Sequence, residues 1–449
     1  MLNEYFGLSE KHTTFKIEIV AGLTTFLTMA YIVFVNPSVL SLEGIELTDI
    51  ERMDKQALIA VTCLVSGLAT IIVGIFAKAP IAMAPGMGLN AFFAYLVSSG
   101  KMDWQTALGV VFLSGLFFLI LTLLGLRKRL VEAIPESLVS AIAVGIGLFI
   151  TFMGLVKLGI VVSDEHTLVK AGPLDATVLI GLFGLLVMIF CEMKKIRGGL
   201  VAGIFASTLL AGLFGRIEMP ERFISLDMNL RAVSLRLDIL GALKWSFFGS
   251  IFTLMFIDMF DSVGTLVACC HQADMVDKEN RIEGLDRLLG IDAIATMIGA
   301  LFGTSTTTAY MESAAGIEQG GRTGLTAVVT GTLFLLTVLF VPVVGIVPRY
   351  ATAPALIMVG LFMMKEVKRI DFANIEEAFP SFIIMVMIAL SYSISTGLAF
   401  GFVSFTLIKM VSGKVKEVKA AMWVIAALSV LFLTLDHMPG MIERLRSIV

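Results

Sequence analysis

Two stretches of the chain decide its fold: AMAPGMGLNAFFAY (82–95) and GTSTTTAYMESAAG (303–316). Each lies within a long apolar region, and neither favours a continuous helix. Pro85 and Gly86 in the first stretch predict that the chain enters extended and turns helical near Asn90. The threonines and the serine of the second stretch favour strand over helix. Both stretches therefore predict an extended segment that passes into a helix inside a membrane span.

The composition is that of a polytopic membrane protein. The chain has 449 residues, of which 57% are hydrophobic and 15% are charged, and its mean hydropathy is +0.95. Soluble proteins have roughly 45–50% apolar and about 25% charged residues. At about 20 residues per spanning helix, the apolar residues suffice for roughly a dozen spans. A net charge of −3 argues against a nucleic-acid partner, and four cysteines exclude a secreted disulfide scaffold.

Apolar runs recur along the whole chain and are separated by short charged loops. Fourteen spans are expected, near 17–35, 56–77, 80–97, 104–126, 134–156, 176–193, 198–215, 245–268, 285–302, 304–318, 323–343, 350–364, 379–395 and 397–412. Residues 216–243 are too charged to span and are expected at the membrane interface. A last apolar run, Ala420–Leu435, either spans or lies flat.

An internal repeat relates the first seven spans to the second seven. Three pairs of segments match in the same order, at offsets of 216, 213 and 198: SGLFFLI (114–120) with TGTLFLL (330–336), IPESLVSAIAVGIGLFI (134–150) with VPRYATAPALIMVGLFM (347–363), and IRGGLVAGIFASTL (196–209) with ISTGLAFGFVSFTL (394–407). An odd number of spans per unit makes the second copy inverted, which in transporters puts the substrate site at the midplane. The alternative is chance similarity among apolar helices.

The repeat places the two unusual stretches in equivalent positions. Adding the offset of 216 puts Asn90 opposite Thr306. Irregular backbone at membrane depth is tolerated where it is buried in protein or lines a cavity. Two half-helices whose N-termini point at one place would make a polar pocket in apolar surroundings. The alternative is a pair of glycine-rich packing contacts.

Three acidic residues within the spans are candidates for function. Asp258 and Asp261 are three apart in IFTLMFIDMFDSVGTL (251–266) and so share a helical face, and Glu312 begins the helical part of the tenth span. A carboxylate at the bilayer centre costs at least about 2.5–3.5 kcal/mol, which makes each a functional candidate. A buried carboxyl group can also load and release a proton near neutral pH. The alternative role is hydrogen bonding between helices.

Other acids and motifs point less clearly to function. The spacing of Asp258 and Asp261 also suits half of a magnesium–diphosphate site in an intramembrane prenyltransferase, but a second acid cluster is missing. Asp292 is expected to be a structural partner or a helix-end residue, and Glu18 and Glu318 to lie near the interface. The four histidines fall in loops or at termini, so no metal site and no cofactor are expected.

The topology has an expected orientation. With the N-terminus inside, 20 of the 33 Lys and Arg residues fall in inner loops. The polar residues 1–16 do not form a cleavable signal peptide. The N-terminus is therefore expected in the cytoplasm.

Five motifs resemble the AzgA-like purine permeases of the nucleobase–cation symporter type-2 superfamily: GLTTFLTMAYIVFVNP (22–37), APGMGLNAFFAY (84–95), FIDMFDSVGTL (256–266), GTSTTTAYMESAAGIEQGGRTGLTAVVTG (303–331) and YATAPALIMVG (350–360). The resemblance runs from about residue 3 to residue 415. It implies an all-α fold of 14 spans in two inverted seven-span repeats, with short antiparallel strands in the broken spans 3 and 10. Spans 1–4 and 8–11 would form a core domain, and spans 5–7 and 12–14 a gate domain. The expected segments are 1–215 (first repeat), 216–243 (interfacial linker), 244–415 (second repeat) and 416–449 (C-terminal apolar segment and tail).

The resemblance also implies roles for individual residues. Asp258 and Glu312 match the two acids that bind the purine, and Asp261 matches the neighbouring acid tied to proton coupling. Asn90 matches the asparagine of the third span that shapes the pocket. The full substrate-binding set is Asp258, Glu312, Asn90, Tyr310, Met311 and Thr308, and the proton-coupling set is Asp261, Asp258 and Glu312.

The function that the resemblance implies is transport, not catalysis. It is proton-coupled uptake of hypoxanthine, guanine or adenine by an elevator-type movement, in a homodimer of the prokaryotic inner membrane. Uracil, xanthine or an inorganic anion on the same fold, and the prenyltransferase, remain as alternatives. An anion carrier would favour half-helix dipoles without acids facing them. Titratable acids favour protons over sodium as the coupling ion.

Overall fold

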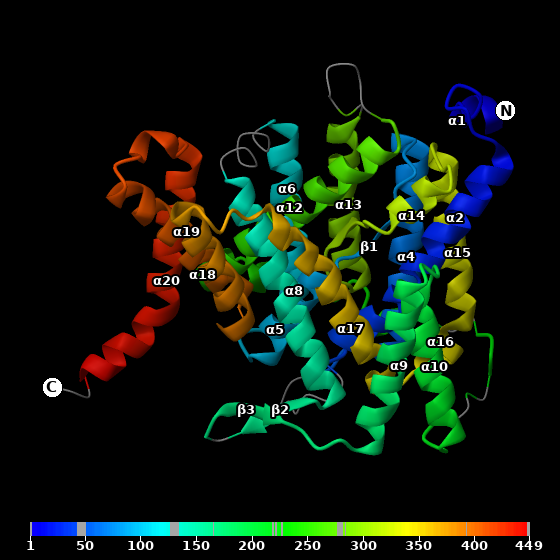
Figure 1. Ribbon diagram of the computed structural model, residues 1–449, viewed down its shortest axis with the longest axis horizontal. Coiled ribbons are helices and arrows are strands. Elements are labelled where there is room, and N and C mark those ends of the chain that lie inside the picture. The colour runs from blue at the N-terminus through cyan, green and yellow to red at the C-terminus, as the bar shows by residue number, and fades with distance from the viewer. Residues whose placement is uncertain are drawn as a thin grey trace. The chain divides into compact units, whose positions relative to one another are not determined.

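The chain folds almost entirely into helices in the computed structural model (Figure 1). The described residues are 2–42, 51–125, 134–164, 166–217, 220, 222–225, 228–275, 282, 284–391 and 393–446, and from residue 435 onward only the backbone is described. They divide into two compact units, one made of Met1–Leu123 and Met153–Met358 and the other of Leu124–Phe152 and Val359–Val449. Helices α8 (Glu136–Leu158) and α17 (Arg349–Met363) each begin in one unit and end in the other.

The first half of the first unit runs from the N-terminus to α10. Its elements are α1 (Leu2–Phe6), α2 (Phe15–Met29), α3 (Ile32–Leu40), α4 (Lys55–Ile72), the π-helical η1 (Val73–Ala77), β1 (Met83–Pro85), α5 (Met87–Ser98), α6 (Trp104–Leu123), the end of α8, β2 (Val161–Asp164), β3 (Leu168–Ala171), α9 (Ala176–Met193) and α10 (Gly199–Leu213).

The second half of that unit contains η2 (Leu230–Ala232), α11 (Ile239–Ala242), η3 (Trp245–Phe247), α12 (Phe248–Gln272), α13 (Leu285–Phe302), β4 (Thr307–Ala309), α14 (Ser313–Glu318), α15 (Gly324–Thr337), η4 (Val338–Phe340), α16 (Val341–Gly345) and the first part of α17. Helix α15 packs against α2 and α4, and α13 packs against α6. Segments far apart in the sequence therefore lie side by side in this unit (Figure 1).

The second unit holds the start of α8, the end of α17, η5 (Met364–Arg369), α18 (Ile375–Ser391), α19 (Ile394–Val411), η6 (Val415–Glu417) and α20 (Ala420–Arg446). Helix α19 packs against α18 and α20. An ion-pair network joins α18 to the end of α19 and to the residues that follow it, because Glu376 pairs with Lys409 at 2.8 Å and with Lys414 at 2.7 Å.

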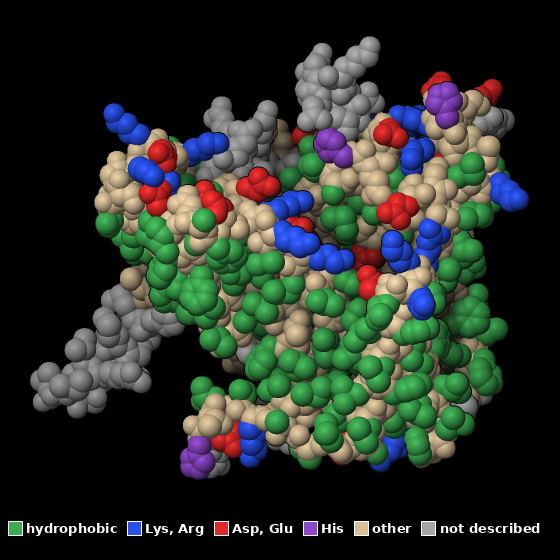
Figure 2. Space-filling view, viewed as in Figure 1, with side chains coloured by type: hydrophobic (Ala, Val, Ile, Leu, Met, Phe, Trp, Pro, Cys, Tyr) green, Lys and Arg blue, Asp and Glu red, His purple; other side chains and the backbone are tan. Residues whose placement is uncertain are grey.

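Within the described part of the chain, nine helices are long and apolar enough to cross a membrane. They are Phe15–Leu40, Lys55–Ala77, Trp104–Leu123, Glu136–Leu158, Ala176–Met193, Trp245–Gln272, Gly324–Gly345, Arg349–Arg369 and Ile394–Val411. Large hydrophobic side chains such as Leu186 and Leu209 are exposed on α9 and α10, and Figure 2 shows a hydrophobic face over these helices. Such a surface suits contact with lipid, and the helical polytopic membrane fold predicted from the sequence is confirmed.

All fourteen apolar stretches expected to span contain a helix or a strand followed by a helix. The first differs in detail, since α2 ends at Met29 and α3 continues to Leu40 after a turn at Ala30 and Tyr31. The described residues of the expected interfacial linker are mostly irregular, with the short elements η2 and α11. Segments 126–133 and 276–281, which supply part of the Lys and Arg behind the expected orientation, lie outside the described residues.

The two stretches that interrupt the helical pattern meet as an antiparallel strand pair. Strand β1 pairs with β4 in the register Met83↔Ala309, Ala84↔Thr308 and Pro85↔Thr307, and every residue of both strands is buried. The chain reaches β4 through Gly303, whose φ of +97° ends α13 in the left-handed region that favours glycine. A side chain at Gly303 would also lie 2.7 Å from the carbonyl oxygen of Val233. The expected strands in the broken spans 3 and 10 are therefore present.

Candidate functional site

The strand pair is completed on its outer edges by one threonine from each side. Thr70 on α4 donates to the carbonyl of Met83 at 3.0 Å and accepts from the Met83 amide at 2.9 Å. Thr296 on α13 does the same for Thr307, at 3.0 Å and 3.2 Å. Buried backbone groups need such partners, because an unpaired one costs about as much as a lost hydrogen bond. These contacts let extended chain persist among spanning helices.

Both strands lead into helices that begin next to the strand pair. After β1 the chain enters α5 at Met87, and the Gly86 amide donates to the carbonyl of Thr306 at 2.9 Å. After β4 the Tyr310 amide donates to the carbonyl of Ala82 at 3.0 Å, and α14 begins at Ser313. Helix starts carry free amide groups and a partial positive charge. The backbone at both starts is therefore held by the opposite half of the chain.

Glu312 lies at the start of α14 and is partly exposed. Its Oε1 atom accepts a hydrogen bond of 2.8 Å from the hydroxyl of Tyr31, which lies at the turn between α2 and α3. The preceding residue, Met311, has 48% of its surface exposed, although its neighbours in β4 are buried. The chain is thus accessible where it leaves the strand and becomes helical.

Helix α12 brings the two aspartates to the same region. Asp258 is 1% exposed, and its Oδ2 atom accepts from the Thr296 hydroxyl at 3.2 Å. Its Oδ1 atom has no hydrogen-bond partner among the described residues. Asp261, one turn further along, is exposed, and its charge interacts with those of Asp258 and Glu312. Because α12 packs against β4 and α14, the three acids expected from the sequence lie in one region of the first unit.

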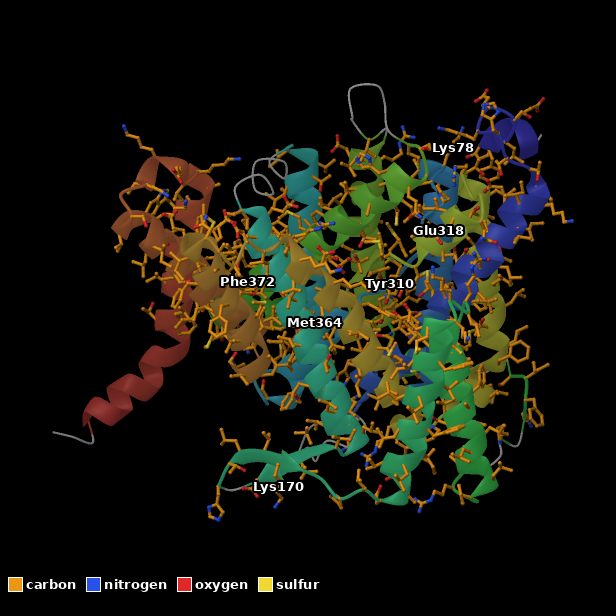
Figure 3. All side chains as sticks on the ribbon, viewed as in Figure 1. Lys78, Lys170, Tyr310, Glu318, Met364 and Phe372 are labelled. Atoms are coloured by element: carbon orange, nitrogen blue, oxygen red, sulfur yellow. The ribbon has the colours of Figure 1, made fainter. Side chains whose placement is uncertain are left out.

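Tyr310 is buried beside these acids and ties them to the first half of the chain. It is 5% exposed, and its hydroxyl donates to the Pro85 carbonyl at 2.6 Å. The Tyr310 phenol group also interacts electrostatically with Glu312 and Asp261. Figure 3 shows Tyr310 in the interior, with Glu318 and Lys78 toward the end of the unit where α1 lies. Tyr310 therefore fixes β1 to the start of α14.

Thr308 and Asn90 have partners that place them in the scaffold around the acids. The hydroxyls of Thr308 and Ser262 are 2.8 Å apart, and the Ser262 hydroxyl donates to Oδ2 of Asp292 at 2.6 Å. Asn90 is fully buried and its Oδ1 atom accepts from the Ser305 hydroxyl. No hydrogen bond among the described residues links Asn90 directly to the three acids. Its predicted substrate contact stays a prediction.

The buried polar groups of this unit include two acids that the sequence analysis named, Glu18 and Asp292, and two hydroxyl residues that it did not, Tyr31 and Thr296. Glu18 is fully buried in the protein and caps α15, and its expected position near the membrane interface stays a prediction. It accepts from the Arg322 amide at 2.9 Å and from the Thr326 amide and hydroxyl at 3.1 Å and 2.6 Å. Asp292 is the structural partner of Ser262, as expected, and lies well inside α13. Tyr31 and Thr296 carried no sequence signal, since single hydroxyl groups are common in spanning helices.

A family model described as the Permease family, of the xanthine/uracil permeases, matches residues 16–436. The chain belongs to this family. Its similarity to other permeases extends over almost the full length of both proteins in each comparison. It is 38% identical to the adenine permease AdeP of Escherichia coli over 96% of this chain and 95% of that protein. It is 40% identical to the guanine/hypoxanthine permease PbuG of Bacillus subtilis over 96% of this chain and 99% of that one.

Solved structures with low sequence identity share the fold. The transmembrane domain of a cyanobacterial bicarbonate transporter, BicA, aligns with a TM-score of 0.63 at 18% identity, over 86% of this chain and 96% of that one. The murine anion transporter Slc26a9 in an inward-facing state aligns with a TM-score of 0.64 at 11% identity, over 89% of this chain and 69% of that one. The resemblance to purine permeases drawn from the sequence motifs is confirmed by the named relatives. Permeases are transporters and not enzymes, which leaves no support for the prenyltransferase alternative.

Proposed function

We propose that this protein is a proton-coupled symporter that imports purine nucleobases (hypoxanthine, guanine or adenine) across the prokaryotic inner membrane. The observation that carries the proposal is the cluster of Glu312, Asp261 and Asp258 beside a broken membrane span. The names of the similar permeases support a purine as the substrate.

The chemistry of the cluster suits a flat neutral base. A purine has N–H donors on both rings and acceptors between them. The Glu312 and Asp258 carboxyl groups can accept from these donors, and Asp258 has an oxygen without a protein partner in the described region. The backbone amides near Tyr310 and Met311 would donate to ring nitrogens or a carbonyl. Asn90 and Thr308 would shape the pocket as part of the scaffold around the acids.

The same acids provide a route to coupling. Two carboxylates close together repel, so binding a base between them costs less when one carries a proton. Asp261, which is exposed and interacts with Glu312, is the proposed entry point for that proton, with Asp258 and Glu312. One proton moving down about 100 mV supplies roughly 2.3 kcal/mol, enough for a gradient of order fifty-fold.

We further propose fourteen spans in two inverted repeats, 1–215 and 244–415, joined by the interfacial linker 216–243 and followed by the C-terminal segment 416–449. Spans 1–4 and 8–11 would carry the substrate as a core domain, in an elevator-type movement against a gate domain of spans 5–7 and 12–14. The N-terminus would be cytoplasmic and the protein a homodimer. Support comes from the matching sequence segments and from the equivalent roles of Thr70 and Thr296 on either side of the strand pair.

The test is uptake of radiolabelled hypoxanthine, guanine and adenine by cells that lack their own purine permeases. Saturable uptake of at least one base, unchanged in sodium-free buffer and abolished by a protonophore, is the expected result. Uptake that persists with the protonophore but requires sodium would overturn proton coupling. Uptake of uracil, xanthine or bicarbonate without any purine would overturn the substrate class.

A further inference from the structure

Tyr31 occupies an unusual place for a tyrosine in a spanning segment. It lies at the turn where α2 ends at Met29 and α3 begins at Ile32, and it is 1% exposed. A buried tyrosine hydroxyl usually finds a hydrogen-bond partner, since an unpaired one costs about 1–3 kcal/mol. Here the partner is the Oε1 atom of Glu312, at 2.8 Å and 281 positions away in the chain.

Other contacts hold α14 against the helix that leads to Tyr31. Gly316 of α14 lies so close to α2 that an added side chain would be 2.6 Å from the Ala21 carbonyl oxygen and would clash with the Thr25 hydroxyl. The Thr28 hydroxyl lies 3.4 Å from the Glu312 carbonyl oxygen. The position of Tyr31 relative to Glu312 is therefore set by close packing along α2 as well as by one hydrogen bond.

Among the described residues, the side chain that donates a hydrogen bond to the Glu312 carboxyl group is Tyr31, through its hydroxyl. The other titratable groups that interact electrostatically with Glu312 are Asp261 and Cys269 on α12 and Tyr310 after β4. Of these, Asp261 repels a charged Glu312, and the Tyr310 hydroxyl donates to Pro85 instead. Without Tyr31, the carboxyl group would lose the contact that fixes its rotamer.

We infer that Tyr31 is a positioning residue of the purine site, which holds one oxygen of Glu312 so that the other faces the N–H donors of the base. The inference rests on the proposed function and assigns to it a residue on the first span. A hydroxyl donates more strongly to a charged carboxylate than to a neutral group. Tyr31 therefore acts on substrate affinity through Glu312, without touching the base itself.

The test compares Tyr31→Phe with Tyr5→Phe in the full-length protein. Phenylalanine keeps the ring and removes only the hydroxyl, so Tyr31→Phe is expected to fold and reach the membrane. A hydrogen bond to a charged group is worth enough to raise the KM of hypoxanthine uptake about tenfold when it is lost, with Vmax changed less than about twofold. Tyr5→Phe removes a hydroxyl that donates to the Ile75 carbonyl far from the site, and should leave both parameters unchanged. Tyr31→His, which retains a ring donor, should recover part of the affinity.

A double-mutant cycle separates positioning from a general structural role. Hypoxanthine binding to purified protein is measured for wild type, Tyr31→Phe, Glu312→Gln and the double variant. If Tyr31 acts through Glu312, the Tyr31 substitution has less than about a twofold effect once Glu312 is glutamine. An equal tenfold loss in both backgrounds, or wild-type KM in Tyr31→Phe, would overturn the inference and leave the proposed function intact. Absence of purine binding by the wild type would overturn the proposed function itself.

Discussion

The first unit contains two half-crossings, namely the strand-to-helix segments β1–α5 and β4–α14. They share a scaffold but differ in chemistry. In each, a buried three-residue strand leads to a helix, and a threonine from a neighbouring helix completes the outer edge of the strand. The first, β1 and α5, continues into twelve helical residues and carries the uncharged, fully buried Asn90. The second, β4 and α14, has only six helical residues and carries the partly exposed Glu312.

The difference shows how a repeated architecture can hold one asymmetric site. The common part satisfies the backbone in a place where water cannot. The second half-crossing carries an acid of its own, Glu312, which interacts electrostatically with Asp261 on the neighbouring helix α12. We therefore expect substitutions in the first half-crossing to alter pocket shape, and substitutions in the second to weaken binding strongly or to abolish coupling.

The largest effect is expected from Glu312→Gln, which keeps the size of the side chain and removes its charge. Loss of a charged acceptor that no other residue replaces should lower purine uptake about 10- to 150-fold, since such a bond is worth roughly 1.5–3 kcal/mol. Initial rates of hypoxanthine uptake at equal surface expression measure it. Glu318→Gln, at the exposed end of the same helix, is the matched control and should retain wild-type uptake. An equal loss of uptake in both variants would show that α14 tolerates no substitution. It would contradict the specific role of Glu312 in the second half-crossing.

Thr70→Val and Thr296→Val test the shared scaffold. Each removes a hydroxyl that serves one strand amide and one strand carbonyl, so each should destabilise the protein by about 1–3 kcal/mol. Thermal unfolding in detergent should show similar decreases for both. Thr296→Val should reduce uptake further, because the single proton of the Thr296 hydroxyl is shared between the Thr307 carbonyl and Oδ2 of Asp258, which lies 3.2 Å away. Equal stability loss with equal uptake loss would contradict the assignment of Asp258 to the site.

Asn90→Ala is expected to change selectivity more than coupling. It removes the acceptor for the Ser305 hydroxyl, a neutral bond worth about 1 kcal/mol, so KM should change about fivefold. Competition of adenine and guanine against labelled hypoxanthine, with and without a protonophore, measures both properties. Ser305→Ala removes the same bond from the other side and should behave alike. Loss of proton dependence in Asn90→Ala would place coupling in the first half-crossing as well.

The smallest effect is expected from Asp164→Asn in the β2–β3 hairpin, outside the spans. Hydrogen bonds from Lys170 and from the backbone of Thr167 and His166 lower the pKa of Asp164 to about 2. A lowered pKa means that the charged form stabilises the hairpin above about pH 4, the usual aspartate value, and that this is lost as pH falls toward 2. The protection of the hairpin amides, measured relative to the intrinsic exchange rate at each pH, should therefore decrease below about pH 4 in the wild type and stay constant in the variant. Uptake between pH 5 and 8 should match the wild type; a changed pH profile would show that acids outside the half-crossings contribute.

Much of the fold followed from the sequence because apolar runs and helix breakers carry strong local signals. Pro85 and Gly86, and the threonines before Tyr310, predicted both irregular segments, and the spacing of Asp258 and Asp261 predicted their common face. Long-range partners were not predictable. Nothing in the sequence pairs Tyr31 with Glu312 or Glu18 with Thr326, since these contacts depend on how distant helices pack. The turn at Ala30, which directs Tyr31 toward α14, likewise follows from packing, because no glycine or proline marks it.

The central claim is that Glu312 at the start of α14 and the two aspartates of α12 couple proton movement to purine movement. It is tested most directly with purified protein in liposomes that contain a pH-sensitive dye. Addition of hypoxanthine outside should acidify the lumen in step with its uptake for the wild type. Asp261→Asn should bind hypoxanthine but produce no acidification. Hypoxanthine entry without any pH change in the wild type, or equal acidification by Asp261→Asn, would contradict the account.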